Sequence, residues 1–589
     1  MCCARCGSAA SAGTTPDLPG KRVVRHGGAI YHFALDAQLG QDWPLTQRYD
    51  AVIIGAGHNG LVCAFYLARA GLKVRIVERR DIVGGAAVTE EFHPGFRNSV
   101  ASYTVSLLQP KVIADMGLAN HGYRVIERPI SNFLPQADGG YLKLGGGLER
   151  TQAEFTRFSL ADAAVLPRYY AALEGVAEVL RDLALKVPPN VGDGYRTLLD
   201  AAVQGRKLAG LGVEAQRDVL DLFTKSARDF LNGWFESEAV KAAFGFDAIV
   251  GNYASPDAPG SAYVLLHHVF GEVNGTRGSW GHSVGGMGTI TQIMARVCRD
   301  MGVEISLESP VARVLVDGGK AVGVQLDSGQ EIAAARVIAN VGPKLLYGRM
   351  IDAADLPPDF ARRIKGYKVG SGTFRMNVAL SDLPRFTCLP APGEHHRSGI
   401  IIAPTLDYMD AAFTDAKAHG WSRAPIVEML IPSTVDDSLA PPGAHVASLF
   451  CQQFAPELPL KSDGTARDWD DEENAAAATI IATVEAYAPG FRASIIGSQI
   501  LSPKGLERKF GLMGGDIMHG HMSLDQLWSA RPMLGHGGYR GPIENLYMCG
   551  AGTHPGGGVT GAPGHNAAAV VLRDARGWFA PRWRQARLQ

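Results

Sequence analysis

The sequence lacks several features that mark other classes of protein. Lys and Arg total 57 and Asp and Glu total 58, so the net charge of −1 provides no broadly basic or acidic surface. No apolar run reaches the roughly 18 to 20 residues of a membrane-spanning helix. We therefore expect a protein without a transmembrane segment and without a nucleic-acid partner.

Cysteine is also scarce, with eight residues in a chain of 589. Cys3 and Cys6 form a C-x-x-C pair near the N-terminus, but no second ligand pair lies nearby, so we expect no metal site. Cys63 is the one cysteine close to the first glycine-rich motif, and its helical position predicts a small core residue. A disulfide reductase needs a redox cysteine pair and a second nucleotide fold, and the sequence has only one intact dinucleotide fingerprint, the one at Gly55, Gly57 and Gly60. That class is excluded.

The sequence does contain a βαβ unit from Val52 to Arg80. Residues 51–54 are a short β-branched apolar run, which predicts a buried parallel strand. Apolar residues then recur at helical spacing from Leu61 to Leu72, and Gly71 is placed to end the helix in a left-handed conformation. Residues 73–77 predict the second strand.

The glycines between the first strand and the helix indicate a dinucleotide site. Gly55 permits a tight turn, Gly57 permits the approach of a pyrophosphate, and Gly60 permits close packing of helix and strand. We assign the whole turn to the cofactor: Gly55, Ala56, Gly57, His58, Asn59 and Gly60. Glu78 ends the second strand, where an acidic side chain accepts hydrogen bonds from ribose hydroxyls and disfavours NADP. The cofactor is FAD or NAD.

Further along the chain the pattern alternates between helical and extended segments. Residues from about 155 to 245 are mostly helical in pattern, and Gly285-Gly286-Met287-Gly288 leads into another helix and a strand. Residues 312–316, 322–326 and 337–339 predict three strands of a β-meander. A helix is expected over 474–487, and residues 546–572 predict a strand, a glycine-rich turn and a helix. Glycine-rich turns near residues 55 and 555 favour the longer cofactor FAD over NAD.

Taken together, these motifs resemble the FAD-dependent phytoene desaturase and amine oxidase superfamily. The resemblance rests on "GAGHNGLV", "ERRDIVGGAAVTEEFHPGF", "WFESE", residues 262–268, "MSLDQLWSARP" and "GAGTHPGGGVTG", and it spans residues from about 48 to 575. It implies an α/β fold with α+β insertions, in which a Rossmann-type FAD-binding domain is built from discontinuous segments and a mixed substrate domain is inserted. The implied divisions are a tail or presequence at 1–47, FAD-binding segments at 48–125, 280–345 and 540–580, substrate segments at 126–279 and 346–539, and a tail at 581–589.

The resemblance also implies roles for further residues. Arg79, Gly84 and Gly85 would lie along the cofactor, and Val311 would meet the adenine through its backbone. Four residues of the last motif would border the ribityl chain and the flavin: Gly550, Gly552, Thr553 and Gly561. After the double glycine, related enzymes usually have arginine where this chain has Ala86 and Ala87.

Catalytic candidates are few, because a flavin performs the redox chemistry itself. His554 lies in the last glycine-rich turn, and His519 and His521 flank Gly520; each could transfer a proton or be structural. Arg531 could anchor an acidic substrate or a phosphate, or form an ordinary salt bridge.

The expected function is that of an FAD-dependent oxidase or dehydrogenase acting on an apolar, unsaturated or amine-bearing small molecule. The alternative is an FAD-stabilised regulatory or scaffold protein whose catalysis has lapsed. The resemblance implies a mitochondrial matrix location and a respiratory-chain protein partner, and the basic, acid-poor residues 1–30 are compatible with a presequence. A cytoplasmic bacterial protein is the alternative location.

Overall fold

The computed structural model describes residues 48–190, 199, 201–203, 205–206 and 209–575. The predicted N-terminal tail, with Cys3 and Cys6, and the predicted C-terminal tail lie outside these residues. None of the helices in the described ranges combines the length and the apolar character that crossing a bilayer requires.

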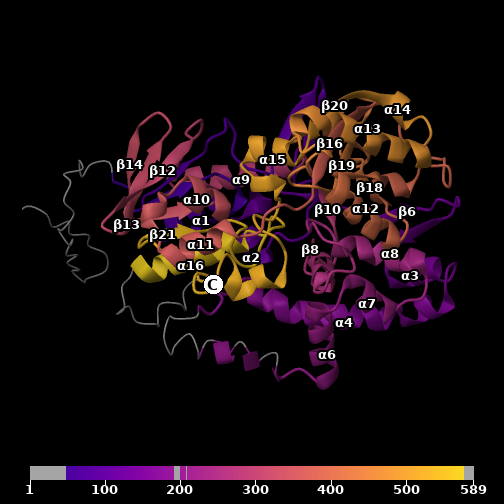
Figure 1. The fold of residues 1–589 in the computed structure, drawn as a ribbon, viewed down its shortest axis with the longest axis horizontal. Coiled ribbons are helices and arrows are strands. Elements are labelled where there is room, and N and C mark those ends of the chain that lie inside the picture. Colours follow the sequence, from indigo (N-terminus) through magenta and orange to yellow (C-terminus); the bar gives the residue numbers. More distant parts are fainter. Residues whose placement is uncertain (1–47, 191–198, 200, 204, 207–208, 576–589) are drawn as a thin grey trace, which may run out of the picture. The chain divides into compact units, whose positions relative to one another are not determined.

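A five-stranded parallel sheet forms the first layer (Figure 1). Its order is β11-β2-β1-β15-β21, with the bounds β1 (Ala51–Ile54), β2 (Val74–Val77), β11 (Glu304–Ser306), β15 (Val337–Ala339) and β21 (Leu546–Met548). Every neighbouring pair runs parallel. The sheet thus joins segments that are far apart in the sequence, as the Rossmann-type fold built from discontinuous segments requires.

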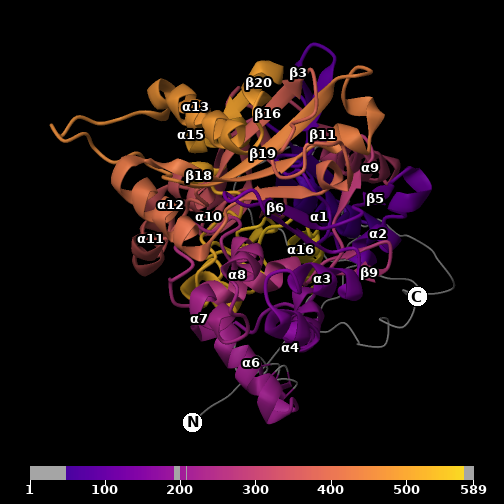
Figure 2. The ribbon, with the colours of Figure 1, turned by 90° about the vertical axis from the view of Figure 1, so that its right-hand side faces the viewer.

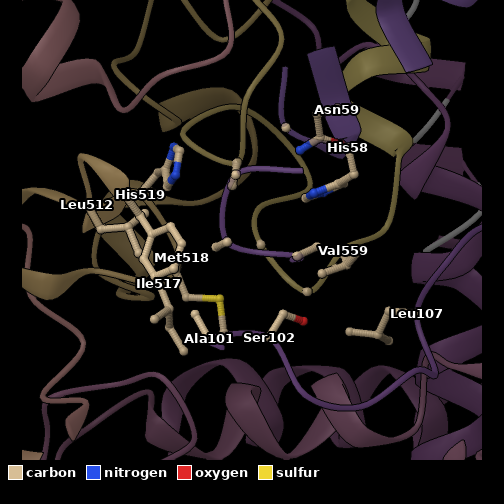
Figure 3. A pocket seen from close by; sticks show the side chains of 18 of the residues that line it. His58, Asn59, Ala101, Ser102, Leu107, Leu512, Ile517, Met518, His519 and Val559 are labelled. Atoms are coloured by element: carbon tan, nitrogen blue, oxygen red, sulfur yellow. The ribbon is translucent and has the colours of Figure 1, made fainter. Parts of the chain in front are cut away.

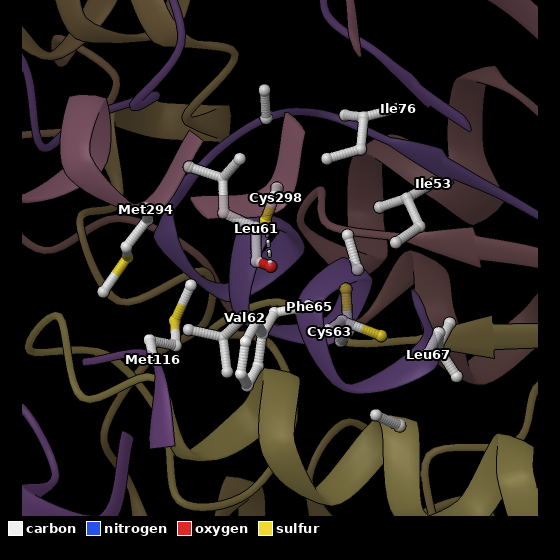
Figure 4. Packing of buried hydrophobic residues seen from close by; sticks show 14 of the residues in the cluster. Ile53, Leu61, Val62, Cys63, Phe65, Leu67, Ile76, Met116, Met294 and Cys298 are labelled. Atoms are coloured by element: carbon white, nitrogen blue, oxygen red, sulfur yellow. Dashed lines mark hydrogen bonds between the residues drawn. The ribbon is translucent and has the colours of Figure 1, made fainter. Parts of the chain in front are cut away.

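Three helices pack beside this sheet: α1 (His58–Arg69), α9 (Met287–Asp300) and α16 (Ala562–Ala575). Figure 4 shows the core that α1 forms, with Leu61, Phe65 and Cys63 meeting Ile53 and Met294. The predicted βαβ unit is confirmed, and Gly71 has a φ of +89° just after α1, as expected of a helix terminator. Cys63 is fully buried in this core, as predicted.

The predicted meander is correct in its first two strands and wrong in its third. Strand β13 (Lys320–Leu326) pairs with β12 (Val311–Asp317) on one side and with β14 (Glu331–Ala333) on the other. Residues 337–339 instead form β15, between β1 and β21 of the parallel sheet. A run of three apolar residues has no information about its partner strand, because that pairing depends on contacts far away in the sequence.

A seven-stranded mixed sheet forms the second layer (Figure 2). In sheet order its strands are β20 (Ile495–Leu501), β16 (Phe374–Leu380), β19 (His445–Phe454), β18 (Trp421–Leu430), β17 (Gly399–Ile402), β6 (Asn132–Pro135) and β7 (Tyr141–Leu144). Helices α12 (Leu406–His419) and α13 (Trp469–Tyr487) pack against it. Strands from residues 132–144 and 374–501 therefore share one core, separate from that of the parallel sheet.

The remaining elements connect these two sheets or cover them. The helices are α2 (Pro110–Asp115), α3 (Leu148–Phe155), α4 (Leu160–Ala184), α6 (Val213–Thr224), α7 (Ala227–Asn232), α8 (Glu238–Gly245), α10 (Pro343–Arg349), α11 (Pro358–Lys365), α14 (Phe491–Ser494) and α15 (Pro503–Phe510). Short strand pairs are formed by β3 (Thr89–His93) with β4 (Phe96–Ser99), by β5 (Val125–Glu127) with β10 (Gly281–Ser283), and by β8 (Glu272–Val273) with β9 (Thr276–Arg277). The cavity described next lies among these elements.

Candidate functional site

A cavity of about 870 Å³ extends from the carboxyl end of β1 to the wall formed by β18. At one end it is lined by the glycine-rich turn, by Glu78 and by Val311. At the other end it is lined by aromatic and charged residues that include Tyr103 and Glu428. A volume of this size is typical of a site for a cofactor or a small molecule.

The turn after β1 is closed tightly by its own backbone. Gly55 has a φ of +93°, and its N–H donates to the Val77 carbonyl at 2.8 Å. A Cβ at Gly60 would lie 2.4 Å from the Gly55 carbonyl oxygen, so no larger residue fits there. The turn thus brings Gly55, Gly57, His58 and Asn59 to the cavity wall, with Gly84 and Gly85 beside them. Ala56 and Gly60 lie behind that wall.

Glu78 is fixed at the end of β2 by two backbone hydrogen bonds. Its Oε2 accepts from the Ala56 N–H at 2.7 Å, and its Oε1 accepts from the Arg80 N–H at 3.0 Å. A carboxylate has about four acceptor positions, so each oxygen can accept one more hydrogen bond. Glu78 lines the cavity, and these remaining positions suit the two hydroxyls of a ribose.

Four buried polar atoms at this end have no hydrogen-bond partner among the described residues. They are His58 Nε2, Asn59 Oδ1, Arg80 Nη1 and His519 Nδ1. Figure 3 shows His58 and Asn59 on one side of the cavity and His519 on the other. Because an unsatisfied buried polar atom is costly, these atoms indicate a polar ligand that crosses the space between them.

Both of these histidines are held in the neutral form. Burial, together with nearby His519, lowers the pKa of His58 to about 3. Burial, together with the positive charge of Arg531, lowers the pKa of His519 to about 4. A neutral imidazole keeps one N–H donor and one acceptor nitrogen, so both side chains can hydrogen-bond to a cofactor without carrying charge.

The other three catalytic candidates do not line the cavity. His554 donates from Nε2 to the Leu183 carbonyl at 3.1 Å, and His521 Nε2 lies 3.3 Å from the Tyr253 carbonyl. Arg531 is fully buried and its guanidinium donates to backbone carbonyls rather than to a carboxylate. Those carbonyls belong to residues 518, 520, 521, 526 and 551. These side chains are structural, and the expected substrate anchor or salt bridge at Arg531 is corrected.

The last glycine-rich segment reaches the cavity through different residues from those predicted. Gly550, Gly552, Thr553 and Gly561 do not line it. Gly552 packs against Pro343, whose Cδ would be 2.3 Å from an added Cβ, and Thr553 Oγ1 donates to the Gly550 carbonyl. The residues of this segment that line the cavity are Ala551, Gly557, Gly558 and Val559. The absence of a side chain at Gly550 and Gly552 therefore allows neighbouring residues to pack closely against the backbone.

The far end of the cavity was missed by the sequence reasoning. Its polar residues are Tyr103, Arg128, Asp247 and Glu428, and its apolar residues include Tyr169, Tyr170, Leu173, Phe244, Phe246 and Leu265. They come from loops, from α4 and α8, and from β18, without any shared local motif. The cavity-lining residues over 507–518 were also missed, although Arg79, predicted to lie along the cofactor, bonds to the Arg508 carbonyl there.

Comparison with known proteins decides the family. Residues 60–374 match the family described as flavin containing amine oxidoreductase. The chain belongs to this family. The rat (Rattus norvegicus) pyridine nucleotide-disulfide oxidoreductase domain-containing protein 2 is 40% identical over 92% of this chain and 96% of its own length. A limonene dehydrogenase subunit from Castellaniella defragrans is 27% identical over 90% of this chain and 95% of its own.

Solved structures agree on the fold. Putrescine oxidase bound to putrescine covers 90% of this chain and 99% of its own, with a TM-score of 0.55 and 16% identity. The protein is therefore an FAD-dependent oxidoreductase of the flavin containing amine oxidoreductase family. The unpartnered atoms of His58, Asn59 and His519, with the carboxylate of Glu78, fit the sugar and phosphate groups of FAD. Within the described residues, no group of three His, Cys, Asp or Glu side chains could hold a metal ion.

Proposed function

We propose that the protein is a dehydrogenase or oxidase of a small molecule with a mainly apolar body. The observation that supports the proposal is that the cavity continues beyond the glycine-rich turn into an end lined by aromatic and aliphatic side chains. Phe244, Phe246 and Leu265 give this end walls that exclude water. Bound FAD supplies the acceptor for a hydride from a C–H bond of such a molecule.

The chain's own residues then have two tasks. The turn at Gly57, the carboxylate of Glu78 and the rings of His58 and His519 hold and orient the cofactor. The apolar walls place the substrate and keep water from it. Both tasks are passive, which accounts for the scarcity of obvious acid and base candidates in the sequence.

An anaerobic titration tests this proposal. The purified protein is expected to be yellow, with flavin bands near roughly 375 and 450 nm. A panel of amines, cyclic terpenes, unsaturated hydrocarbons and amphipathic acids is then added without oxygen. The amines and terpenes are chosen because similar proteins are named for putrescine and limonene. The proposal expects bleaching of the band near roughly 450 nm by at least one apolar-bodied compound.

Two outcomes argue against the proposal in different ways. A colourless protein that takes up no added FAD would remove its basis. A yellow protein that dithionite reduces, but that no compound in the panel reduces, would favour the regulatory or scaffold alternative. Titration with FAD before the substrate panel separates these two results.

A further inference from the structure

Arg128 stands out among the charged residues at the far end of the cavity. It follows β5 and lines the cavity, yet its side chain makes one hydrogen bond among the described residues, from Nη2 to Thr104 Oγ1 at 2.6 Å. It forms no ion pair with any described carboxylate. Arginine carries five N–H donors, so most of this group's hydrogen-bonding capacity is available to a ligand.

The orientation of Arg128 is fixed from the side of the protein. Thr104 Oγ1 accepts from the guanidinium and itself donates to the Gly281 carbonyl at 3.2 Å. The guanidinium thus cannot swing freely, and it presents its remaining edge as a rigid set of donors. Such a planar fork matches the two oxygens of a carboxylate.

The carboxylate that acts electrostatically on Arg128, that of Glu428, already has a hydrogen-bond partner. Glu428 accepts a short hydrogen bond from the Tyr103 hydroxyl, and a second guanidinium, Arg375, lies 4.6 Å from the Tyr103 ring centroid. Arg375 is fully buried and donates to Ser448 Oγ at 2.7 Å. The positive charges of Arg128 and Arg375 both act on the single carboxylate of Glu428, and neither guanidinium forms an ion pair with it.

Asp247 does not balance this positive charge. Burial, helped by the negative charge of Glu428, raises the pKa of Asp247 well above its usual value, which favours the neutral acid. Burial also raises the pKa of Glu428, against the opposing effect of Tyr103, Arg128 and Arg375. With Asp247 neutral, the two guanidinium groups of Arg128 and Arg375 face the one carboxylate of Glu428, which leaves this end of the cavity with a positive charge.

Apolar surface lies beside this charge. Tyr169 and Tyr170 interact electrostatically with Asp247, which in turn interacts with Glu428. All four residues line the cavity, so the charged cluster and the aromatic wall lie close enough to influence each other's charge. The Tyr169 hydroxyl is buried there with no hydrogen-bond partner among the described residues.

We propose that Arg128 binds a carboxylate of the substrate, so that the substrate is an amphipathic carboxylic acid whose apolar part packs against the aromatic wall. The inference rests on the proposed function, because it concerns the substrate end of the same cavity. On this proposal, Arg128 binds an anionic head group more tightly than an amine or a neutral group.

Three ligands of equal chain length test the head group: phenylbutanoate, phenylbutanol and phenylbutylamine. Each is titrated into protein whose FAD content has been measured, and the change in the flavin absorption spectrum reports binding without turnover. Phenylbutanoate is expected to bind at least about 10-fold more tightly than the other two. Tighter binding of the amine, or no spectral change with the acid, would overturn the proposal.

Two variants and a control locate the effect. Arg128→Met is expected to weaken the binding of phenylbutanoate by about 100-fold and to leave the binding of phenylbutanol unchanged. The variant should retain FAD. Arg128→Lys should bind phenylbutanoate more tightly than Arg128→Met and less tightly than the wild type, because lysine keeps the positive charge but lacks the planar pair of donors of the guanidinium. The control is Arg277→Met, which removes another cavity arginine, one that pairs with Glu174 at 3.0 Å. The acid-to-alcohol ratio should not change in it.

The remaining results are also decisive. Loss of FAD from Arg128→Met would make Arg128 a cofactor ligand and overturn the proposal. An equal effect of Arg128→Met on all three ligands, or a loss of the acid's preference in Arg277→Met, would overturn it as well. Absence of FAD from the wild-type protein would instead refute the proposed function itself.

Discussion

The two ends of the cavity are built in different ways. At the cofactor end, the wall is a continuous turn whose backbone geometry is set by neighbouring residues from Gly55 to Gly60, with Glu78 a strand away. At the far end, Tyr103, Arg128 and Glu428 come from separate segments and meet through long-range packing. The cofactor end therefore depends on a local motif, and the substrate end depends on the whole fold.

The largest effect is expected at Arg531, whose guanidinium donates to the carbonyls of Met518 and Ala551, two residues of the cavity wall. Arg531→Met removes a buried donor that serves five backbone carbonyls and should lower the free energy of unfolding by about 3 to 5 kcal/mol. Denaturant unfolding measures this loss. The control Arg349→Met removes an exposed pair with Glu507 and should cost less than about 1 kcal/mol. Equal losses in both variants would contradict the structural role assigned to Arg531.

The next effect concerns the cofactor end alone. Glu78→Ala removes the acceptor for two ribose hydroxyls and releases the Ala56 and Arg80 amides, so the dissociation constant for FAD should rise about 100-fold. Titration of apoprotein with FAD, followed by flavin fluorescence, measures it. Glu331→Ala, on the exposed meander strand β14, is the matched control and should bind FAD as the wild type does. An unchanged affinity of Glu78→Ala for FAD would show that the glycine-rich turn binds the cofactor without the Glu78 carboxylate.

A pH dependence follows from the buried histidines. The pKa of His58, of His519 and of His554 is depressed to about 3, 4 and 4, so the unfolded chain takes up protons that the folded chain does not. The contribution of these histidines to the free energy of unfolding is fully present above pH 6.5, and it is lost as the pH decreases toward 4. The slope should be roughly 1.4 kcal/mol per pH unit for each such group. His58→Asn should reduce the slope of apoprotein stability between pH 6.5 and 5, and an unchanged slope would mean that His58 titrates normally.

The smallest effect is expected in the core behind the turn. Burial and the Cys63 thiol raise the pKa of Cys549, and neither cysteine lines the cavity. Cys63→Ala should lower the free energy of unfolding by about 1 kcal/mol, because only a small buried group is lost. The reduced and oxidised flavin spectra should match those of the wild type. A changed flavin spectrum on reduction would instead indicate a redox role for this thiol pair.

The sequence predicted the features whose causes are local. The unit from β1 to β2 follows from apolar periodicity, and the position of Glu78 follows from the length of the turn and the helix. The sequence misassigned β15, because a short apolar run looks the same whichever strand it pairs with. Gly550 and Gly552 pack against Asn340 and Pro343, and their place beside the flavin stays a prediction. The sequence predicted no role for Arg128 or Glu428, because these residues are far apart along the chain and belong to no shared motif.

The parallel sheet also constrains how the protein matures on the ribosome. Strand β1 lies between β2 and β15, and β21 completes the edge only after nearly all of the chain has been made. At about 5 to 20 residues per second, Ala551 and Val559 would be synthesised roughly 25 to 100 seconds after the early glycine turn. During that interval the apolar faces of α1 and β1 lack their late partners, so nascent chains should depend on chaperones, and flavin capture should be posttranslational.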